Sequence, residues 1–235
     1  GDGSPVTMAD QAAECIILEK LANTGIPVLG EESVAAGKIP VLGNRFFVVD
    51  PLDGTKEFIK RNGEFTVNIA LVEEGVPVAG VVTAPAMDQE FFADENGAYF
   101  ASGKDAPIQI TTLPDGPNYM VASRSHGHSA LQKLYAALDV EKDVSVGSSL
   151  KLCMVAKGEA KFYPRFTPTC EWDIAAGHAI LARAGGEVLT LSGEPLRYGK
   201  SDQDFYNPFF AAAASLEVAQ NTANKMVEFA PPYRR

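Results

Sequence analysis

Two aspartates three residues apart lie in the segment Asp50-Pro51-Leu52-Asp53-Gly54-Thr55. The apolar residues 46–49 before it predict a buried strand, which we expect to stop at Pro51 because proline cannot donate a hydrogen bond to a sheet. Gly54 permits a tight turn and close backbone approach to a ligand, and Thr55 can open a helix. Carboxylates at a strand end suit a cation, and free N–H groups at a helix start suit a phosphate. The segment therefore predicts phosphoryl chemistry, although Asp, Pro and Gly also form ordinary turns.

Further acidic residues at three places in the chain could join this site. The pair Glu31-Glu32 follows the short apolar run Val28-Leu29, and adjacent carboxylates at ~4 Å repel by roughly 4 kcal/mol at an effective dielectric near 20. A cation would relieve that repulsion, but a solvated pair explains the sequence equally well. Asp10 lies three residues after Thr7, the predicted N-cap of a helix that ends near residue 21. A charge that serves the helix dipole is the simpler interpretation of Asp10, and the same interpretation is open for Asp173.

Two loops in the second half carry groups that bind anions. Ser123-Arg124-Ser125-His126 follows a predicted strand, and Gly147-Ser148-Ser149-Leu150-Lys151 leads into a predicted helix. Hydroxyl, guanidinium, imidazole and ammonium groups donate to phosphate, yet each loop could simply cap a helix. In a chain with a cation site, the two loops together favour a phosphorylated ligand. Arg165 as a surface charge and His178 as a packed histidine remain open alternatives.

The hydrophobic pattern divides the chain into two halves. Strand-like runs and turn residues alternate over residues 65–100, which predicts an antiparallel meander. Proline and glycine cluster between residues 106 and 117, which is typical of a boundary, and strands alternate with helices beyond it. The sequence therefore predicts subdomains at residues 1–106 and 107–235. Predicted strands of the second half are 119–122, 144–146, 160–163 and 187–191, and its predicted helices are 129–138, 150–156 and 172–184.

Composition excludes several classes of function. The 235 residues are 46% hydrophobic and 21% charged, as in soluble globular proteins, and the net charge of −10 argues against nucleic acid as a partner. Divalent cations could still make the site attractive to a small phosphate. No signal peptide is evident, and no apolar run approaches the ~18 residues of a membrane span. Cys15, Cys153 and Cys170 are odd in number and far apart, so we expect packed cysteines in a reducing, cytoplasmic compartment, with peripheral membrane contact left open.

These motifs together resemble the lithium-sensitive, magnesium-dependent phosphatase superfamily that includes inositol monophosphatase. The resemblance rests on Gly30-Glu31-Glu32, on Asp50 to Thr55, and on Trp172-Asp173 followed by Ala176-Gly177, and it extends from Ser4 to Pro208. It implies a mixed α/β (α+β) fold, a layered αβαβα sandwich with an antiparallel-rich first half and an α/β second half. The family usually carries an N-terminal helical segment before the loop at Ser4, and this sequence does not contain it.

The resemblance also implies the roles of individual residues. Two or three Mg²⁺ ions would be held by Glu31, Asp50, Asp53, Asp173 and the carbonyl of Leu52. Asp10 and Thr55 resemble the catalytic pair that orients and deprotonates a water molecule, and the N–H groups of Gly54 and Thr55 would hold the scissile phosphate.

Within the superfamily, the second half resembles the bacterial 3′(2′),5′-bisphosphate nucleotidase branch. Ser123 to His126, Gly147 to Lys151 and Tyr163 to Thr169 carry this likeness. It implies hydrolysis of 3′-phosphoadenosine 5′-phosphate to AMP and phosphate by a monomer or homodimer. The substrate would be bound by Gly54, Thr55, Ser123, His126, Ser149, Lys151, Arg165 and Asp173.

Two alternatives remain open from the sequence. One is an inositol monophosphatase or another sugar phosphatase of the same superfamily, because the second-half loops decide the substrate. The other is a catalytically silent protein that binds metal and phosphate. The sequence gives the second little support, since the four carboxylates and Thr55 are all present.

Overall fold

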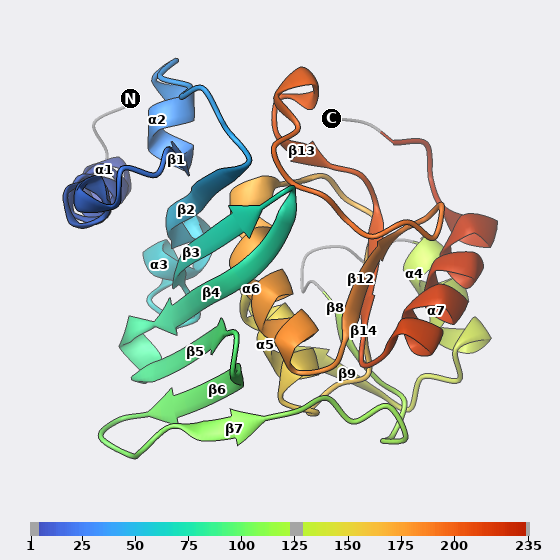
Figure 1. Cartoon of the computed structure of the whole chain (residues 1–235). Coiled ribbons are helices and arrows are strands. Elements are labelled where there is room, and N and C mark those ends of the chain that lie inside the picture. Colours follow the sequence, from blue (N-terminus) through green and yellow to red (C-terminus); the bar gives the residue numbers. More distant parts are fainter. Residues whose placement is uncertain (1–4, 123–128, 234–235) are drawn as a thin grey trace.

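The computed structural model describes residues 5–122 and 129–233, and the first half of the chain builds a seven-stranded sheet in the order β1-β2-β3-β4-β5-β6-β7 (Figure 1). The pair β1–β2 is parallel and every later pair is antiparallel, which confirms the predicted meander. The strands are β1 (Val28–Gly30), β2 (Arg45–Asp53), β3 (Thr66–Glu73), β4 (Val76–Ala84), β5 (Gln89–Asp94), β6 (Gly97–Ser102) and β7 (Ile108–Ile110). The helices of this half are α1 (Pro5–Leu21), α2 (Glu31–Ala35) and α3 (Thr55–Lys60).

The second half builds a five-stranded mixed sheet in the order β12-β14-β10-β8-β9. Its strands are β8 (Tyr119–Ala122), β9 (Lys142–Ser145), β10 (Phe162–Arg165), β12 (Glu187–Thr190) and β14 (Phe210–Ala213), and β11 (Thr169–Cys170) pairs separately with β13 (Tyr206–Asn207). Its helices are α4 (Ser129–Ala137), α5 (Leu150–Ala156), α6 (Glu171–Arg183) and α7 (Leu216–Phe229). No helix in the described part of the chain is long and apolar enough to cross a membrane.

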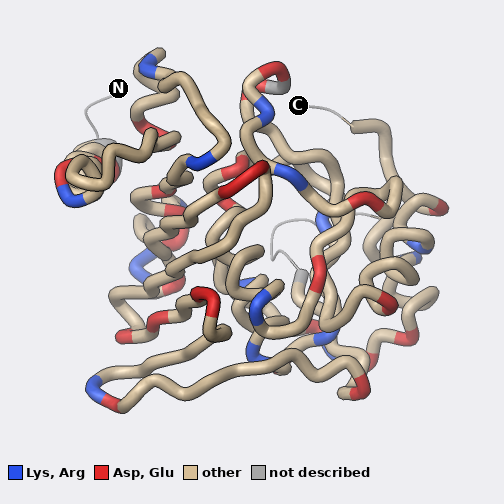
Figure 2. The backbone as a smooth tube through the Cα atoms, viewed as in Figure 1, with Lys and Arg blue, Asp and Glu red and all other residues tan. Residues whose placement is uncertain are grey.

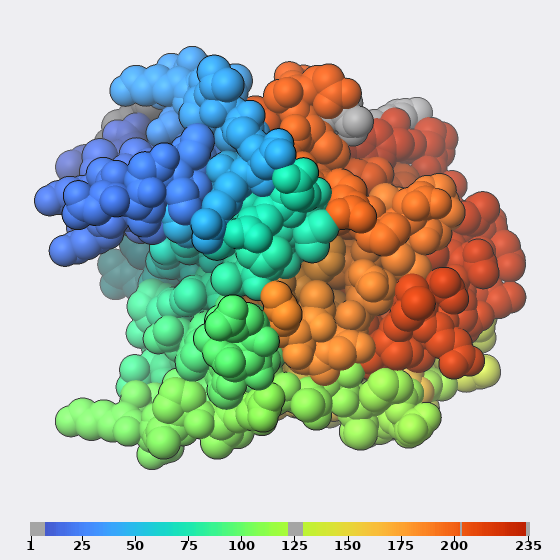
Figure 3. All heavy atoms as spheres, viewed as in Figure 1, coloured from blue at the N-terminus to red at the C-terminus, as the bar shows by residue number. Residues whose placement is uncertain are grey.

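The elements stack in five layers. Helices α5 and α6 lie between the two sheets, α1 packs on the far side of the first sheet, and α4 and α7 cover the outer face of the second (Figure 1). This arrangement confirms the predicted αβαβα sandwich. In the space-filling view the two halves meet directly across the visible face (Figure 3).

Small residues let α6 approach the first sheet closely. A Cβ placed on Gly80 of β4 would lie 2.6 Å from the carbonyl oxygen of Ala176, so only glycine fits at this crossing. On the other side of the helix, a Cβ on Gly177 would lie 2.7 Å from Leu152 of α5. This close packing fixes the position of α6 between the two sheets, and therefore also the position of Asp173, which lies in the first turn of the helix.

Two predictions about element ends are wrong. Helix α1 begins at Pro5 rather than after Thr7, since proline is well tolerated at the first helical position, so Thr7 lies inside the helix and is not its N-cap. Strand β2 does not stop at Pro51 but runs to Asp53. Between Asp50 and Asp53 the pairing with β3 shifts register, and this bulge takes Pro51 out of the hydrogen-bond ladder.

Other elements extend beyond what the pattern predicts. Strand β7 lies after residue 106 and pairs with β6, so the first sheet continues past the predicted subdomain division, which itself stays a prediction. The pattern predicts no element after residue 191, whereas β14 pairs there between β10 and β12, and α7 packs on β12, β14 and β10. Residues 192–235 therefore contain more helix and strand than the sequence pattern predicts.

Candidate active site

The acidic residues come together because the parallel strand β1 ends beside the middle of β2, just before Asp50. Gly30 at the end of β1 is the register partner of Val49 in β2, so Glu31 and Asp50 each follow directly after a paired position. The side chain of Asp50 is 1% exposed and accepts a hydrogen bond from the N–H of Leu52 at 2.9 Å. The β2 bulge then brings Asp53 level with Thr66 of β3. The strand geometry thus gathers three of the predicted metal ligands at one sheet edge.

The fourth carboxylate arrives from the middle helical layer. Asp173 lies in the first turn of α6, where its Oδ2 accepts a hydrogen bond from the N–H of Cys170 at 2.8 Å. Burial, and after it the negative charges of Asp53 and Glu31, raises the pKa of this carboxyl group. Asp173 therefore faces the acids of the first sheet although it is 120 residues further along the chain than Asp53.

Burial and mutual repulsion make these acids weak. Burial raises the pKa of Glu31 to about 7 and that of Asp173 to about 8, with neighbouring carboxylates adding to the shift. Burial, followed by the charges of Asp53 and Glu31, raises the pKa of Asp50 well above its usual value. The pKa of Asp53 is also raised by burial, while Lys151 acts in the opposite direction. Such a set of acids is stabilised in its charged form by an added cation.

Asp10 approaches the same region from α1. One carboxylate oxygen, Oδ1, is buried without a hydrogen-bond partner, and burial followed by the charge of Glu32 raises the pKa of Asp10 to about 6. A buried acceptor without a donor is costly, which fits a group that awaits a ligand or a water molecule. Thr55 is exposed at the start of α3, and α1 contacts that helix.

The turn at Gly54 is closely packed. Gly54 has φ +92°, and a Cβ at this position would lie 2.1 Å from the hydroxyl oxygen of Ser148. That hydroxyl donates to the carbonyl oxygen of Asp53 at 3.0 Å. Only glycine therefore fits at the start of α3, and the loop before α5 is held against the carboxyl end of β2.

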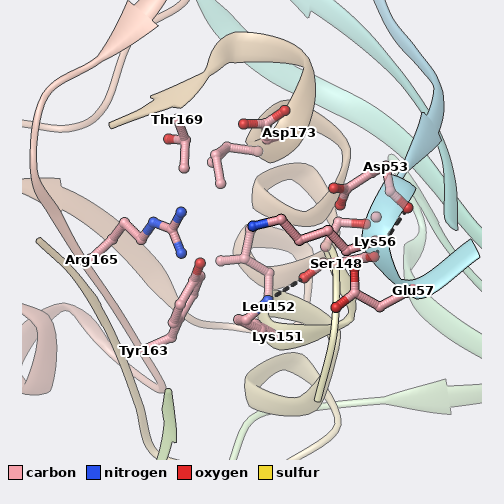
Figure 4. Close-up of a pocket in the computed structure, with 13 residues that line it drawn as sticks. Asp53, Lys56, Glu57, Ser148, Lys151, Leu152, Tyr163, Arg165, Thr169 and Asp173 are labelled. Carbon is pink, nitrogen blue, oxygen red and sulfur yellow. Dashed lines mark hydrogen bonds between the residues drawn. The ribbon is translucent and has the colours of Figure 1, made fainter. Parts of the chain in front are cut away.

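A pocket opens between these acids and the second half (Figure 4). Arg165 and Tyr163 on β10 lie on one side of it, opposite Asp53 on β2 and Glu57 on α3. The Lys151 ammonium donates to the carbonyl oxygen of Ser148 at 2.9 Å, and the Arg165 Nε donates to the carbonyl oxygen of Thr167 at 3.2 Å. The lining residues are Asp53, Gly54, Lys56, Glu57, Ser148, Ser149, Lys151, Leu152, Tyr163, Arg165, Thr169, Asp173 and Ile174.

Most of the predicted substrate-binding residues line this pocket, but two lie outside the described part of the chain. Gly54, Ser149, Lys151, Arg165 and Asp173 line this pocket, whereas Ser123 and His126 lie outside the described residues. The hydroxyl of Ser149 is already engaged, since it donates to Asn68 Oδ1 at 2.6 Å and lies 2.8 Å from the hydroxyl oxygen of Thr66.

Several pocket residues escaped the sequence analysis as site residues. The sequence predicts no binding role for Lys56, Glu57, Tyr163 or Thr169, which all line the pocket. Their positions in the sequence could have indicated a role in the pocket, because Lys56 and Glu57 follow Thr55, and Tyr163 and Thr169 belong to the same segment as Arg165.

The residues present fit a hard divalent cation by their chemistry. Carboxylates and a backbone carbonyl are oxygen ligands, and the acids named above repel one another strongly. Among the residues that the structure describes, no three acidic, histidine or cysteine side chains are placed closely enough to enclose an ion. Asp53 and Asp173 line the pocket, and Glu31 and Asp50 lie near them without lining it; these four carboxylates, the acidic edge, are an open cluster rather than a closed set of ligands.

Packing accounts for His178 and for one of the three cysteines. His178 is buried, its Nδ1 lies 2.9 Å from the hydroxyl oxygen of Tyr198, and burial lowers its pKa to about 3, so it is a neutral packed histidine. The cysteines are free, but only Cys153 is fully buried, and Cys15 is exposed on α1, contrary to the expectation of a packed residue. Acidic residues otherwise lie on elements of both halves (Figure 2).

Comparisons with known proteins agree with the fold and the motifs. A sequence model described as the inositol monophosphatase family matches residues 1–228. A Salmonella typhimurium protein named 3′(2′),5′-bisphosphate nucleotidase CysQ is 48% identical over 212 residues, which cover 89% of this chain and 85% of that protein. The crystal structure of CysQ from Bacteroides thetaiotaomicron, described as a bacterial member of the inositol monophosphatase family, superposes with a TM-score of 0.78 at 44% identity, covering 91% of this chain and 86% of that one. Inositol monophosphatase II from Staphylococcus aureus gives a TM-score of 0.77 at 26% identity, covering 97% and 83%.

Proposed function

This chain belongs to the inositol monophosphatase family, and from that premise we propose that it is a Mg²⁺-dependent phosphatase that removes the 3′-phosphate of 3′-phosphoadenosine 5′-phosphate. The observation that carries the proposal is the pocket in which Asp53 and Asp173 face Arg165. A metal ion would stabilise the carboxylates, and the Arg165 guanidinium on the other side of the pocket could bind a phosphate group. A phosphomonoesterase requires this charge pattern. The names of the relatives at 46–48% identity favour the bisphosphate nucleotide as substrate.

We assign the metal ligands to the acidic edge, of which Asp53 and Asp173 line the pocket, and to one backbone carbonyl beside it. They are the carboxylates of Glu31, Asp50, Asp53 and Asp173 and the carbonyl oxygen of Leu52. Mg²⁺ bound there would supply Lewis acidity to activate water and to stabilise the leaving oxygen. Dependence on Mg²⁺ is general in the family, and the binding of two or three ions belongs to the proposal.

The remaining roles follow from position. Asp10, whose buried Oδ1 has no partner, would accept the proton of the attacking water, and the exposed hydroxyl of Thr55 would orient that water. The N–H groups of Gly54 and Thr55 would hold the scissile phosphate. Lys151 and Arg165 would bind the second phosphate through charge-assisted hydrogen bonds.

Four statements from the sequence remain part of the proposal. Ser123 and His126 would contact the nucleotide, and Ser149 would help to shape the pocket from the start of α5. The protein would act in the cytoplasm on a small nucleotide rather than on nucleic acid. It would be a monomer or a homodimer. It would be inhibited by lithium.

The test is phosphate release from 3′-phosphoadenosine 5′-phosphate and from inositol 1-phosphate, side by side, with Mg²⁺ and then with added Li⁺. The proposal predicts fast, lithium-sensitive release from the nucleotide alone. Preference for inositol 1-phosphate would keep the metal site and change the substrate assignment, in line with the inositol monophosphatases of the same fold. No release from these or from other phosphorylated sugars would leave a silent metal- and phosphate-binding protein.

A further inference from the structure

Glu14 is a buried carboxylate that none of the roles above uses. It lies on α1 and is 3% exposed, although it is an acid on a helix whose neighbouring residues Gln11 and Cys15 are exposed. A buried carboxylate is tolerated only when hydrogen bonds replace the water that it loses. The partners of Glu14 therefore indicate what it is for.

Its partners all belong to the start of α2. Oε2 accepts from the N–H of Glu32 at 2.9 Å, and Oε1 accepts from the N–H of Ser33 at 2.8 Å and from the Ser33 hydroxyl at 2.5 Å. These N–H groups lie in the first turn of a helix, where no intrahelical acceptor exists. The residue before the helix is Gly30, which has no side chain to cap it. Glu14 therefore caps α2 from another helix.

The fit between the two elements is tight. A Cβ on Gly30 would lie 2.6–2.9 Å from the carboxyl atoms of Glu14, so glycine at this position makes room for the carboxylate. Glu31 follows Gly30 immediately, between that contact and the two N–H groups that Glu14 holds. Glu14 thus packs against the backbone before Glu31, a predicted metal ligand, and accepts hydrogen bonds from the backbone after it.

The same residue links this turn to the proposed water-activating acid. Asp10 and Glu14 are four residues apart on α1, so their side chains lie on one face of that helix. We infer that Glu14 is a positioning residue, which holds the turn of Glu31 at a fixed distance from Asp10. This inference rests on the proposed function, because it needs Glu31 as a ligand. It does not depend on the identity of the substrate.

The decisive experiment is calorimetric titration of Mg²⁺ into the metal-free protein and into Glu14→Gln. A glutamine offers one acceptor oxygen and one amide group that cannot accept, so one backbone N–H of α2 loses its partner. We expect the dissociation constant for Mg²⁺ to rise about 10-fold, as for other groups that orient metal ligands. The matched control is Glu19→Gln, an exposed acid on the same helix, which should leave the constant unchanged.

The outcomes separate positioning from simple stabilisation. A purely structural role would lower the melting temperature of Glu14→Gln and leave the Mg²⁺ dissociation constant within twofold of the original, and that result would overturn the inference. In turnover assays, positioning predicts a higher Mg²⁺ concentration for half-maximal rate, with kcat at saturating Mg²⁺ retained within about threefold. An equal fall of kcat at all Mg²⁺ concentrations would also overturn it.

A second variant covers the case in which Glu14→Gln does not fold. Ser33→Ala removes one of the three donors and keeps both backbone bonds, so it should weaken Mg²⁺ binding about threefold, and an unchanged constant would then count against the inference. If the original protein binds Mg²⁺ but does not hydrolyse the nucleotide, the proposed substrate fails while the titrations still decide the role of Glu14. If the original protein binds no Mg²⁺, both the proposed metal site and this inference are wrong.

Discussion

The two sides of the pocket balance their charges in different ways. On the acidic side, Asp53 and Asp173 are half-buried near other carboxylates, and each raises the pKa of its neighbours. On the basic side, Lys151 and Arg165 donate to backbone carbonyls, which hold them in place without neutralising their charge. We therefore expect a bound cation to stabilise the mutually repelling acids, whereas Lys151 and Arg165 are held in place and could receive an anion without rearrangement. This difference predicts positive cooperativity, in which bound metal raises the affinity for phosphate and bound phosphate raises the affinity for metal.

The largest expected effect comes from removing one acid. Asp53→Asn should abolish Mg²⁺-dependent turnover, with a loss of more than roughly 100-fold, because even groups that only orient metal ligands cost 10–100-fold. Steady-state rates and circular dichroism check the prediction. The control is Asp105→Asn, an exposed acid in the turn before β7, which should retain full activity. Unchanged activity of Asp53→Asn would remove Asp53 from the metal site.

The next effect separates metal binding from proton transfer on the acidic side. Asp10→Asn should lower kcat by roughly 10²–10⁴-fold, the usual contribution of a general base. Its Mg²⁺ affinity should stay close to the original, because Asp10 is not assigned as a ligand. Calorimetric titration of Mg²⁺, together with steady-state rates, distinguishes a proton acceptor from a metal ligand. A loss of Mg²⁺ binding equal to that of Asp53→Asn would make Asp10 a ligand instead.

Changes on the basic side should affect substrates selectively. Lys151→Ala or Arg165→Ala should reduce kcat/KM for the bisphosphate roughly 10- to 100-fold, since a hydrogen bond to a charged group contributes about 1.5–3 kcal/mol. A monophosphate should lose much less, because it has no second phosphate for these cations. Comparing 3′-phosphoadenosine 5′-phosphate with 3′-AMP for each variant is the measurement. Equal losses on both substrates would contradict the assignment.

The smallest effect is on stability without metal. Folded Glu31 has a pKa of about 7 and folded Asp173 about 8, whereas unfolded carboxyl groups titrate near 4. The folded state therefore binds more protons than the unfolded state across this window, and stability should fall as pH rises from about 4 to 8. Melting curves with a chelator should shift down by at least about 2 °C between pH 5.5 and 8, the shift from about 1 kcal/mol in a chain of this size.

Added Mg²⁺ should remove most of that fall, because the cation stabilises the ionised carboxylates that repulsion otherwise destabilises. A melting temperature of the metal-free protein that stays constant or rises across this pH range would show that these acids do not repel one another in the folded state.

On the acidic side, Asp50 and Asp53 follow from local signals, a strand end and turn residues, whereas the roles of Glu31, Asp10 and Asp173 are predicted from the family resemblance. The bulge in β2 does not follow, since proline within a strand is acceptable only where pairing with β3 shifts register. Glu14 is equally hidden, because its partners lie 18 and 19 residues away. The alanine-rich strand β14 has little strand propensity of its own, and pairing with β10 and β12 makes it a strand.

The basic side is harder to predict for a related reason. Lys151 and Arg165 come from a helix and a strand that meet only when the second sheet has assembled. Tyr163 shares β10 with Arg165, and its place on the pocket wall depends on which face of that strand points inward. The acids could thus be proposed from the family motifs, but the shape of the pocket required the tertiary structure.

The most direct test of the central claim is calorimetric titration of Mg²⁺ into the metal-free protein, with and without inorganic phosphate, alongside Asp53→Asn. Saturable binding to the original protein, strengthened by phosphate and lost in Asp53→Asn, is the predicted result. Binding that is absent from the original protein, or that survives unchanged in Asp53→Asn, would contradict the assignment of the acidic edge as the metal site.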